Sequence, residues 1–133
     1  MKFLTDEWFE QVMVRANAHF NKPGKMTLTF CEVCTDCPEG DPTKWIYYDI
    51  KNGLIAEAKL GCGEAPAADF RGKGAYADHV RICKGELDPK KAVMDKVVSI
   101  ENNQGSVNPL KLVKLIDMYM KMTDAKRIPG IEY

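Results

Sequence analysis

Hydrophobic residues recur every three or four positions near both ends of the chain and alternate with polar residues in between. The recurring pattern predicts helices, and residues that favour helix ends mark their bounds. Thr5 is a favoured cap before the first run, and Pro23-Gly24 stops that run. Asp88-Pro89 and Asn108-Pro109 each set a cap residue before a proline that suits the first helical turn. Four helices are predicted: one between Thr5 and Lys22, and others at residues 75–84, 89–94 and 108–126.

Alternation and turn residues predict five strands. Met26, Leu28 and Phe30 alternate with threonines, but the alternation changes parity at Cys31. We therefore expect a bulge, or the end of that strand, at Cys31. The other predicted strands are Trp45–Ile50, Leu54–Leu60, Ala67–Arg71 and Val97–Glu101.

The second and third strands flank a short turn whose length decides which side chains share a face. A two-residue turn at Asn52-Gly53 would bring Tyr48 opposite Glu57 and mix apolar with charged residues. A three-residue turn pairs Ile50 with Leu54 and leaves one apolar face. The pattern therefore predicts the three-residue turn.

The predicted order of elements is α-β-β-β-β-α-α-β-α. Strands grouped ahead of helices favour an α+β domain, with a five-stranded, mostly antiparallel sheet and helices packed on one face. The chain has 133 residues, which is the usual size of a single domain, so we expect one domain over residues 1–133.

Charge and composition narrow the choice of partners. Basic and acidic residues both number 19, so the formal net charge is zero. Nucleic acid is disfavoured because its binding needs basic residues that neutralise phosphates, and nothing indicates docking on an anionic membrane. No apolar stretch reaches the ~20 residues that span a bilayer, and the amino terminus does not resemble a secretory signal. Five cysteines, an odd number, indicate reduced thiols, so we expect a soluble, cytoplasmic protein.

The last predicted helix has an apolar arc much wider than a surface helix needs. Its polar residues form one narrow stripe of Lys111, Lys114, Asp117 and Lys121. Such a helix is packed on two sides within its own domain, forms a dimer contact, or covers an apolar cavity as a lid. Methionines late in the chain favour the lid, because flexible thioether side chains repack around ligands of varied shape.

A combination of short segments identifies a fold family. The segments are Trp45–Gly53, Ala68-Asp69, Gly85-Glu86-Leu87-Asp88-Pro89 with Ala92, Val98-Ser99-Ile100-Glu101 and the last helix. In this combination the chain resembles the sterol carrier protein type 2 family over about residues 26–122. Lys96 and Asn102 depart from the pattern, because the family often has glycine there and lysine tolerates a left-handed backbone poorly.

The resemblance implies an apolar tunnel between sheet and helices for a fatty acid, fatty acyl-CoA, sterol or phospholipid. The implied role is noncatalytic binding or transfer of that lipid. The residues themselves offer no catalytic constellation, so no enzyme activity and no cofactor are expected. The side chains predicted to contact lipid are Phe30, Ile46, Tyr48, Val80, Met94, Leu112, Ile116, Tyr119 and Met120.

A glycine-rich segment precedes the second helix. Gly72-x-Gly74 mimics a dinucleotide-binding fingerprint but lacks the surrounding strand-helix-strand unit. Arg71 and Lys73 near a helix amino terminus are instead candidates to bind an anionic lipid head group.

The cysteines suggest an alternative that the resemblance does not explain. Cys31, Cys34 and Cys37 are spaced as in zinc or iron–sulfur sites, and Cys62 is placed at the same end of the predicted sheet. Against such a site, an extended strand would point Cys31 and Cys34 to opposite faces. A metal or redox module built on these four cysteines is thus one competing hypothesis. A homodimerisation domain without ligand, formed through the wide apolar helix face, is another.

Overall fold

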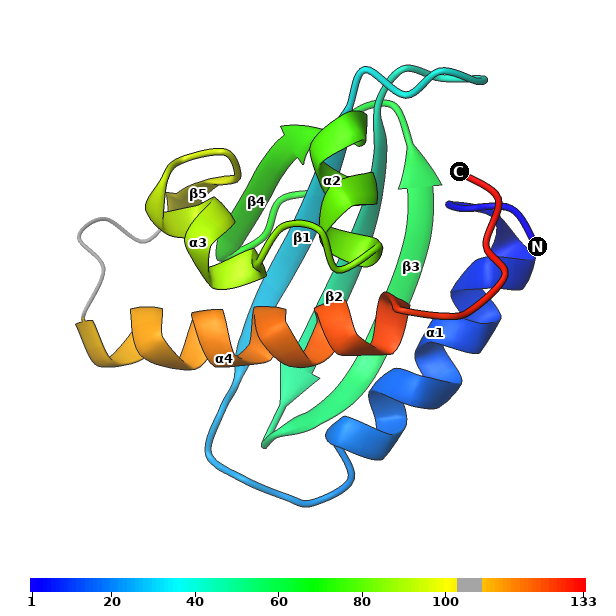
Figure 1. Ribbon diagram of the computed structural model, residues 1–133. Helices are drawn as coiled ribbons and strands as arrows, with labels where there is room; N and C mark the ends of the chain where they lie inside the picture. Colours follow the sequence, from blue (N-terminus) through cyan, green and yellow to red (C-terminus); the bar gives the residue numbers. More distant parts are fainter. Residues whose placement is uncertain (103–108) are drawn as a thin grey trace.

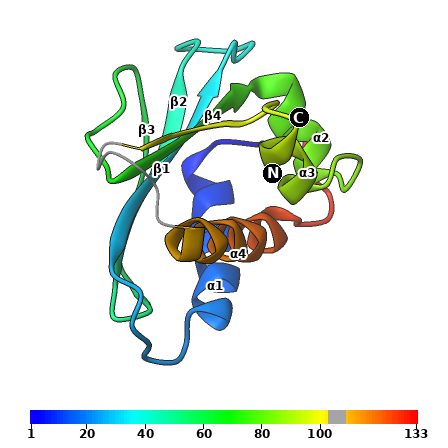
Figure 2. The ribbon, with the colours of Figure 1, turned by 90° about the vertical axis from the view of Figure 1, so that its left-hand side faces the viewer.

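The computed structural model describes residues 1–102 and 109–133, the side chain of residue 109 excepted. Its elements are α1 (Asp6–His19), β1 (Leu28–Thr35), β2 (Lys44–Lys51), β3 (Leu54–Cys62), β4 (Phe70–Ala75), α2 (Tyr76–Cys83), α3 (Pro89–Met94), β5 (Ser99–Asn102) and α4 (Pro109–Lys126). The strands form one sheet in the order β3-β2-β1-β4-β5, and the helices lie on one side of it (Figures 1 and 2). The predicted α+β class and element order are confirmed, while the predicted cap at Asn108 lies outside the described residues.

The strand β1 lies at the centre of the sheet. It pairs with β2 in antiparallel and with β4 in parallel orientation, while the other two pairs are antiparallel. The parallel pairing of Phe30 with Phe70 makes β4 start at Phe70, so the prediction of a strand at Ala67–Arg71 is displaced. Gly72 pairs with Glu32 in this strand. Glycine suits this position because a Cβ atom there would lie 3.1 Å from the Phe30 ring.

The hairpin between β2 and β3 differs from the prediction. Its turn has two residues, Asn52-Gly53, with φ angles of +51° and +78°, so the predicted three-residue turn is wrong. An irregularity between Asp49 and Ile50 then shifts the register, so that Tyr48 faces Ala58. The prediction assumed a regular ladder, and the bulge restores the apolar face that the shorter turn alone would have lost.

The strand β1 continues without interruption past Cys31, so the predicted bulge or strand end is wrong. Its pairing with β2 is regular from Leu28 to Cys34. Alternation therefore places Cys31 and Val33 on the face away from the helices, and Glu32 on the face that the helices cover. The change of parity in the sequence reflects a buried carboxylate, Glu32, rather than a break in the strand.

The core lies between the sheet and the helices. Its fully buried large side chains include Trp8, Val12, Phe30, Tyr48, Ile50, Leu115, Met118 and Met122. Within α4, the described side chains from Leu110 to Lys114 are partly or fully exposed, and full burial begins at Leu115. The two halves of α4 therefore differ in how firmly they pack.

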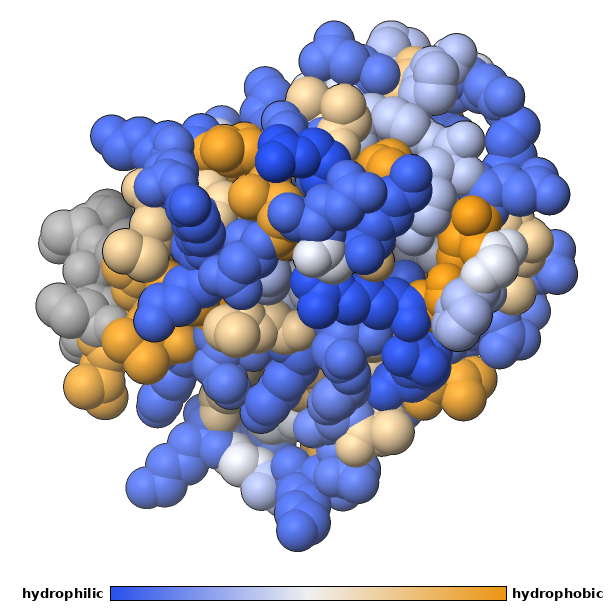
Figure 3. All heavy atoms as spheres, in the orientation of Figure 1, coloured by the Kyte–Doolittle hydropathy of each residue, from blue (hydrophilic) through white to orange (hydrophobic). Residues whose placement is uncertain are grey.

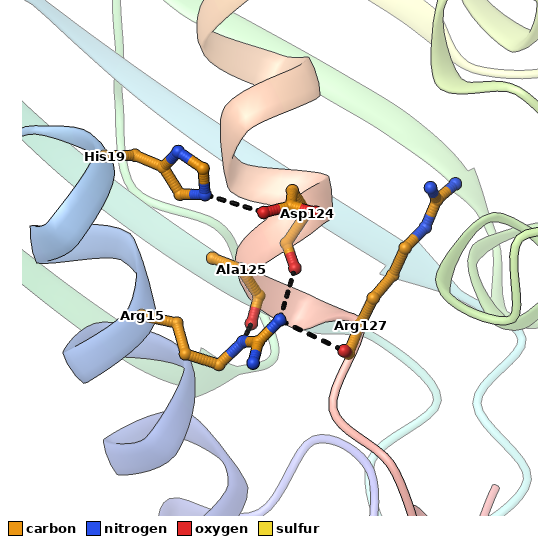
Figure 4. A network of polar contacts seen from close by, with 5 residues as sticks. All are labelled: Arg15, His19, Asp124, Ala125 and Arg127. Atoms are coloured by element: carbon orange, nitrogen blue, oxygen red, sulfur yellow. Dashed lines mark hydrogen bonds and ion pairs between the residues drawn. The ribbon is translucent and has the colours of Figure 1, made fainter.

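Hydrogen bonds fix the carboxyl-terminal end of α4. The guanidinium of Arg15 in α1 donates to the carbonyl oxygens of Ala125, Asp124 and Arg127 at 3.0, 3.2 and 3.2 Å (Figure 4). These carbonyls lie in and just beyond the last turn, so Arg15 satisfies groups that a helix end leaves unpaired. The guanidinium of Arg127 donates in turn to the Ile82 carbonyl in α2 at 3.1 Å.

Lys96, after α3, has a φ angle of +59°, in the left-handed region that glycine adopts most readily. A side chain in this conformation costs about 1–2 kcal/mol, which glycine avoids. We expect Lys96→Gly to raise the free energy of unfolding by about 1 kcal/mol, measured by urea denaturation. The control Lys90→Gly, in helical backbone of α3, is expected to lower it by about 1 kcal/mol. Equal destabilisation by both changes would contradict the account of Lys96.

Candidate functional site

The predicted lipid-contacting residues fall into three groups by burial. Phe30, Ile46, Tyr48 and Tyr119 are buried, each at most 3% exposed, between the sheet and the helices. Val80, Leu112 and Ile116 are partly buried. Met94 and Met120 are instead 68% and 41% exposed, on the outer surface of α3 and α4. The structure thus brings the first group together and separates the two methionines from it.

A charged pair that sequence reasoning missed lies inside this interface. The Glu32 carboxylate forms an ion pair with the Lys126 ammonium, and both side chains are about 5% exposed. The Tyr48 hydroxyl donates a hydrogen bond to Glu32 at 3.3 Å. Burial, and then the charge of Glu32, raise the pKa of Tyr48 well above its usual value, so this phenol remains a proton donor. A signal was present in the sequence, because Lys126 follows Met122 by four positions on the apolar arc of the last helix.

Other polar atoms near this pair are buried without a partner. Within the described part of the chain, Oε1 of Glu32 and the hydroxyls of Tyr119 and Thr123 form no hydrogen bond. A cavity of about 20 Å³ beside Glu32 and Lys126 is also lined by His79. A cavity of this size has room for one water molecule. The interface between the sheet and α4 is therefore partly polar rather than uniformly apolar.

His79 of α2 contributes a neutral ring to this interior. Its Nε2 lies 3.2 Å from the Val33 carbonyl oxygen, so this nitrogen carries the proton and donates. Burial, and then the charge of Lys126, lower the pKa of His79 below its ordinary 6.5, although Glu32 partly opposes them.

Because His79 is buried as a neutral ring, the folded protein becomes less stable as the pH falls. The unfolded chain binds a proton at His79 near pH 6.5, whereas the folded protein resists protonation until the pH is lower. Lowering the pH from 7 to 5 should therefore destabilise the fold, at up to about 1.4 kcal/mol per pH unit below 6.5. We expect His79→Gln, which retains a donor for Val33, to show a flatter dependence in urea denaturation over this range. Parallel curves for the two proteins would contradict this role of His79.

A cavity of about 120 Å³ opens where β1 and β4 begin, beneath the first turns of α4. Met26, Leu28 and Phe70 give it an apolar wall. Lys111 and Lys114 of α4 lie at this cavity. Its other lining residues are Lys25, Thr27 and Asp69.

A second cavity, of about 390 Å³, adjoins the first and shares Lys25, Met26 and Lys114 with it. It adds Lys22 and Lys121, while no carboxylate belongs to its lining residues. The Lys121 ammonium also lies 5.8 Å from the centre of the Phe20 ring, within the range of a cation–π contact. The two cavities combine apolar walls with five lysines and one carboxylate, Asp69, and we call them the α4 groove.

The predicted head-group residues, Arg71 and Lys73, lie on the opposite face of the sheet. They line a separate cavity of about 360 Å³ together with Glu64 and Glu101. The Arg71 guanidinium donates to the carbonyl oxygens of Ala65 and Pro66 at 3.2 and 3.0 Å, so it holds the segment that crosses this face. The sheet separates both residues from the predicted lipid-contacting side chains.

The four candidate cysteines are not brought together either. Cys31 is buried on the face away from the helices, and Cys62 is exposed in the edge strand β3. Only Cys34 and Cys37 are in contact, with their sulfur atoms 3.6 Å apart. Burial raises the pKa of Cys31 to about 12, which disfavours the thiolate that a metal needs. Among the described residues, no group of three or more histidine, cysteine or acidic side chains is arranged to hold a metal ion.

Comparisons with known proteins point to one fold. No protein-family model and no curated protein matches the chain. A crystal structure of sterol carrier protein 2 matches with a TM-score of 0.77 at 19% identity, covering 95% of this chain and 98% of that one. A Thermus thermophilus protein described as possibly a sterol carrier protein has a TM-score of 0.71 at 20% identity, covering 96% and 89%. Palmitated sterol carrier protein 2-like 2 of Aedes aegypti has a TM-score of 0.57 at 16% identity, covering 88% and 93%.

None of the helices in the described part of the chain is long and apolar enough to cross a membrane. The sheet order, the helices on one face and the match along almost the whole chain agree with one another. The protein therefore has the sterol carrier protein 2 fold.

Proposed function

We propose that this protein binds a lipid that has a hydrocarbon tail and an anionic head group, without catalysing a reaction on it. The tail lies between the sheet and α4, and the head lies among the lysines of the α4 groove. The observation that carries the proposal is the cavity that joins Met26, Leu28 and Phe70 to Lys111 and Lys114. The sterol carrier protein 2 fold supports the same assignment.

The energetics of a tail favour binding without any chemistry. Each buried methylene contributes about 0.8 kcal/mol, so a long acyl chain gains on the order of 10 kcal/mol before the cost of association. The 120 Å³ cavity is smaller than the roughly 300–1,000 Å³ of typical ligand sites, so the tail has to displace protein atoms.

The packing of α4 indicates which part moves. Arg15 and the Glu32–Lys126 pair hold the carboxyl-terminal half of the helix. Leu112 and Ile116, in the amino-terminal half, are only partly buried. An outward shift of that half, about a fixed carboxyl-terminal end, opens a path along the sheet from the α4 groove to Phe30.

The lysines supply the selectivity that a hydrocarbon contact lacks. Apolar burial is non-directional, so it discriminates weakly between lipid tails. A carboxylate or phosphate accepts charge-assisted hydrogen bonds from lysine ammonium groups, which fixes the head and orients the tail. The palmitated state of the Aedes aegypti protein supports a fatty acid as the first ligand to test.

The head-group assignment is tested with paired lysine variants. We expect Lys111→Gln with Lys114→Gln to weaken fatty-acid binding about tenfold, because two charge-assisted contacts are lost. The control Lys59→Gln with Lys73→Gln removes two exposed charges elsewhere and should leave binding unchanged. The affinity of each double variant for palmitate is measured by displacement of a fluorescent fatty acid. A loss confined to the control pair would contradict the assignment, and would place the head on the face that bears Lys73.

A further inference from the structure

Exposed hydrophobic side chains of this protein gather on two neighbouring helices. Of the six large ones that are exposed in the described part of the chain, four lie on α3 and α4: Met94 (68% exposed), Leu110 (67%), Val113 (67%) and Met120 (41%). The helix α3 packs against α4, and Figure 3 shows hydrophobic surface over the amino-terminal end of α4. The other two, Val14 and Leu54, lie on α1 and β3. We call the four residues the α3/α4 patch.

Lysines surround the α3/α4 patch although the whole chain has no net charge. Residues 89–96 and 110–121, which span the patch, contain six lysines and two carboxylates, Asp95 and Asp117. Asp117 is exposed between Val113 and Met120 and pairs with Lys121 at 3.1 Å. The other five lysines are exposed: Lys90, Lys91, Lys96, Lys111 and Lys114. The zero formal charge of the sequence therefore hides a local excess of positive charge. Apolar side chains beside an excess of lysines match the interface of an anionic bilayer, where apolar groups enter the acyl boundary and ammonium groups face lipid phosphates.

We propose that the α3/α4 patch docks this protein on the surface of a membrane that contains anionic lipids. The inference rests on the proposed function, because docking there brings the α4 groove to the bilayer. Lys111 and Lys114 border both the patch and the 120 Å³ cavity. A lipid leaving the membrane thus meets the half of α4 whose side chains are least buried. Met94 and Met120 then contact lipid from outside the fold, where their exposure places them.

The test uses the full chain and vesicles of phosphatidylcholine, with and without phosphatidylserine, in a co-sedimentation assay. We expect binding only to vesicles that contain phosphatidylserine, and release at high salt, since surface charges are screened. Lys90→Gln with Lys91→Gln should lower partitioning roughly tenfold to thirtyfold, because each lysine at an anionic surface contributes about fivefold. Val113→Asp should lower it similarly. Its matched control is Val14→Asp, which changes a valine that is 70% exposed on α1 and should bind as the wild type does.

Each variant is also assayed for fatty-acid binding in solution, where all three should match the wild type because none of these residues lines the α4 groove. Normal fatty-acid binding without any vesicle binding overturns the docking proposal and leaves the proposed function standing. Vesicle binding as described, without fatty-acid binding, overturns the proposed function alone. If Val14→Asp and Val113→Asp reduce vesicle binding equally, the α3/α4 patch is not the docking site. If the protein binds vesicles with and without phosphatidylserine equally, the docking proposal is also overturned. A concentration-dependent dimer that Val113→Asp abolishes also overturns it, since a second copy would then cover the patch.

Discussion

Replacing Lys126 by methionine is expected to lower the free energy of unfolding by about 3–5 kcal/mol, because it leaves the Glu32 carboxylate buried without its partner. Glu32 is 4% exposed, so bulk solvent does not compensate for the loss of the ammonium group. The Tyr48 hydroxyl would remain as a single donor to that carboxylate. Urea denaturation at neutral pH measures the loss.

The control restores electrical neutrality in the same place. Glu32→Gln combined with Lys126→Met removes both charges and keeps an acceptor for Tyr48, so it should recover most of the stability lost in the single variant. A double-mutant cycle separates the ion pair from the packing of the long lysine chain. If Lys126→Met alone costs less than about 1 kcal/mol, the buried ion pair is not a stabilising feature of this fold.

Placing a carboxylate on the tail path is expected to abolish lipid binding. Ile116→Glu puts a charge on the partly buried face of α4, beside the space that the tail would occupy. Burying an acyl chain against an ionised group costs several kcal/mol, so affinity for a fatty acid should fall at least about a hundredfold. The matched control is Val113→Glu, three positions earlier on the same helix and 67% exposed, which should bind within about twofold of the wild type.

Both variants are compared by displacement of a fluorescent fatty acid, after circular dichroism has confirmed that each one folds. Equal affinities for Ile116→Glu and the wild type would mean that the tail does not run beneath α4. Equal losses in both variants would place the ligand on the outer surface of the helix instead.

Local signals predicted the helices well, because the residues that set their ends are adjacent in the sequence. The Asp88 side chain accepts a hydrogen bond from the Lys91 amide at 3.0 Å, as its position before Pro89 indicated. Thr5 caps α1 in the same way. The predicted bounds of α3 and the end of α4 therefore match the structure.

The errors in the strands have nonlocal causes. Glu32 broke the apparent alternation of β1 because its partner, Lys126, lies 94 positions away. The bulge in the β2–β3 hairpin sets which side chains of the two strands face the helices. The position of the helices cannot be read from the sequence of the hairpin alone.

The candidate site was predicted only in part for the same reason. Buried apolar residues such as Phe30 and Tyr119 follow from periodicity, and they lie where the prediction placed them. The lysines of the α4 groove come from the loop before β1 and from α4, and only the fold brings them together. Arg71 was predicted at the end of a strand and Lys73 in the turn before a helix, but pairing with β1 makes both part of β4 and turns them to the other face.

Native mass spectrometry of the full chain incubated with palmitate tests the central claim most directly. The account predicts one palmitate per chain in the wild type and in Val113→Glu, and none in Ile116→Glu. A wild-type chain that carries no palmitate, under conditions where an established fatty-acid carrier does, would contradict it.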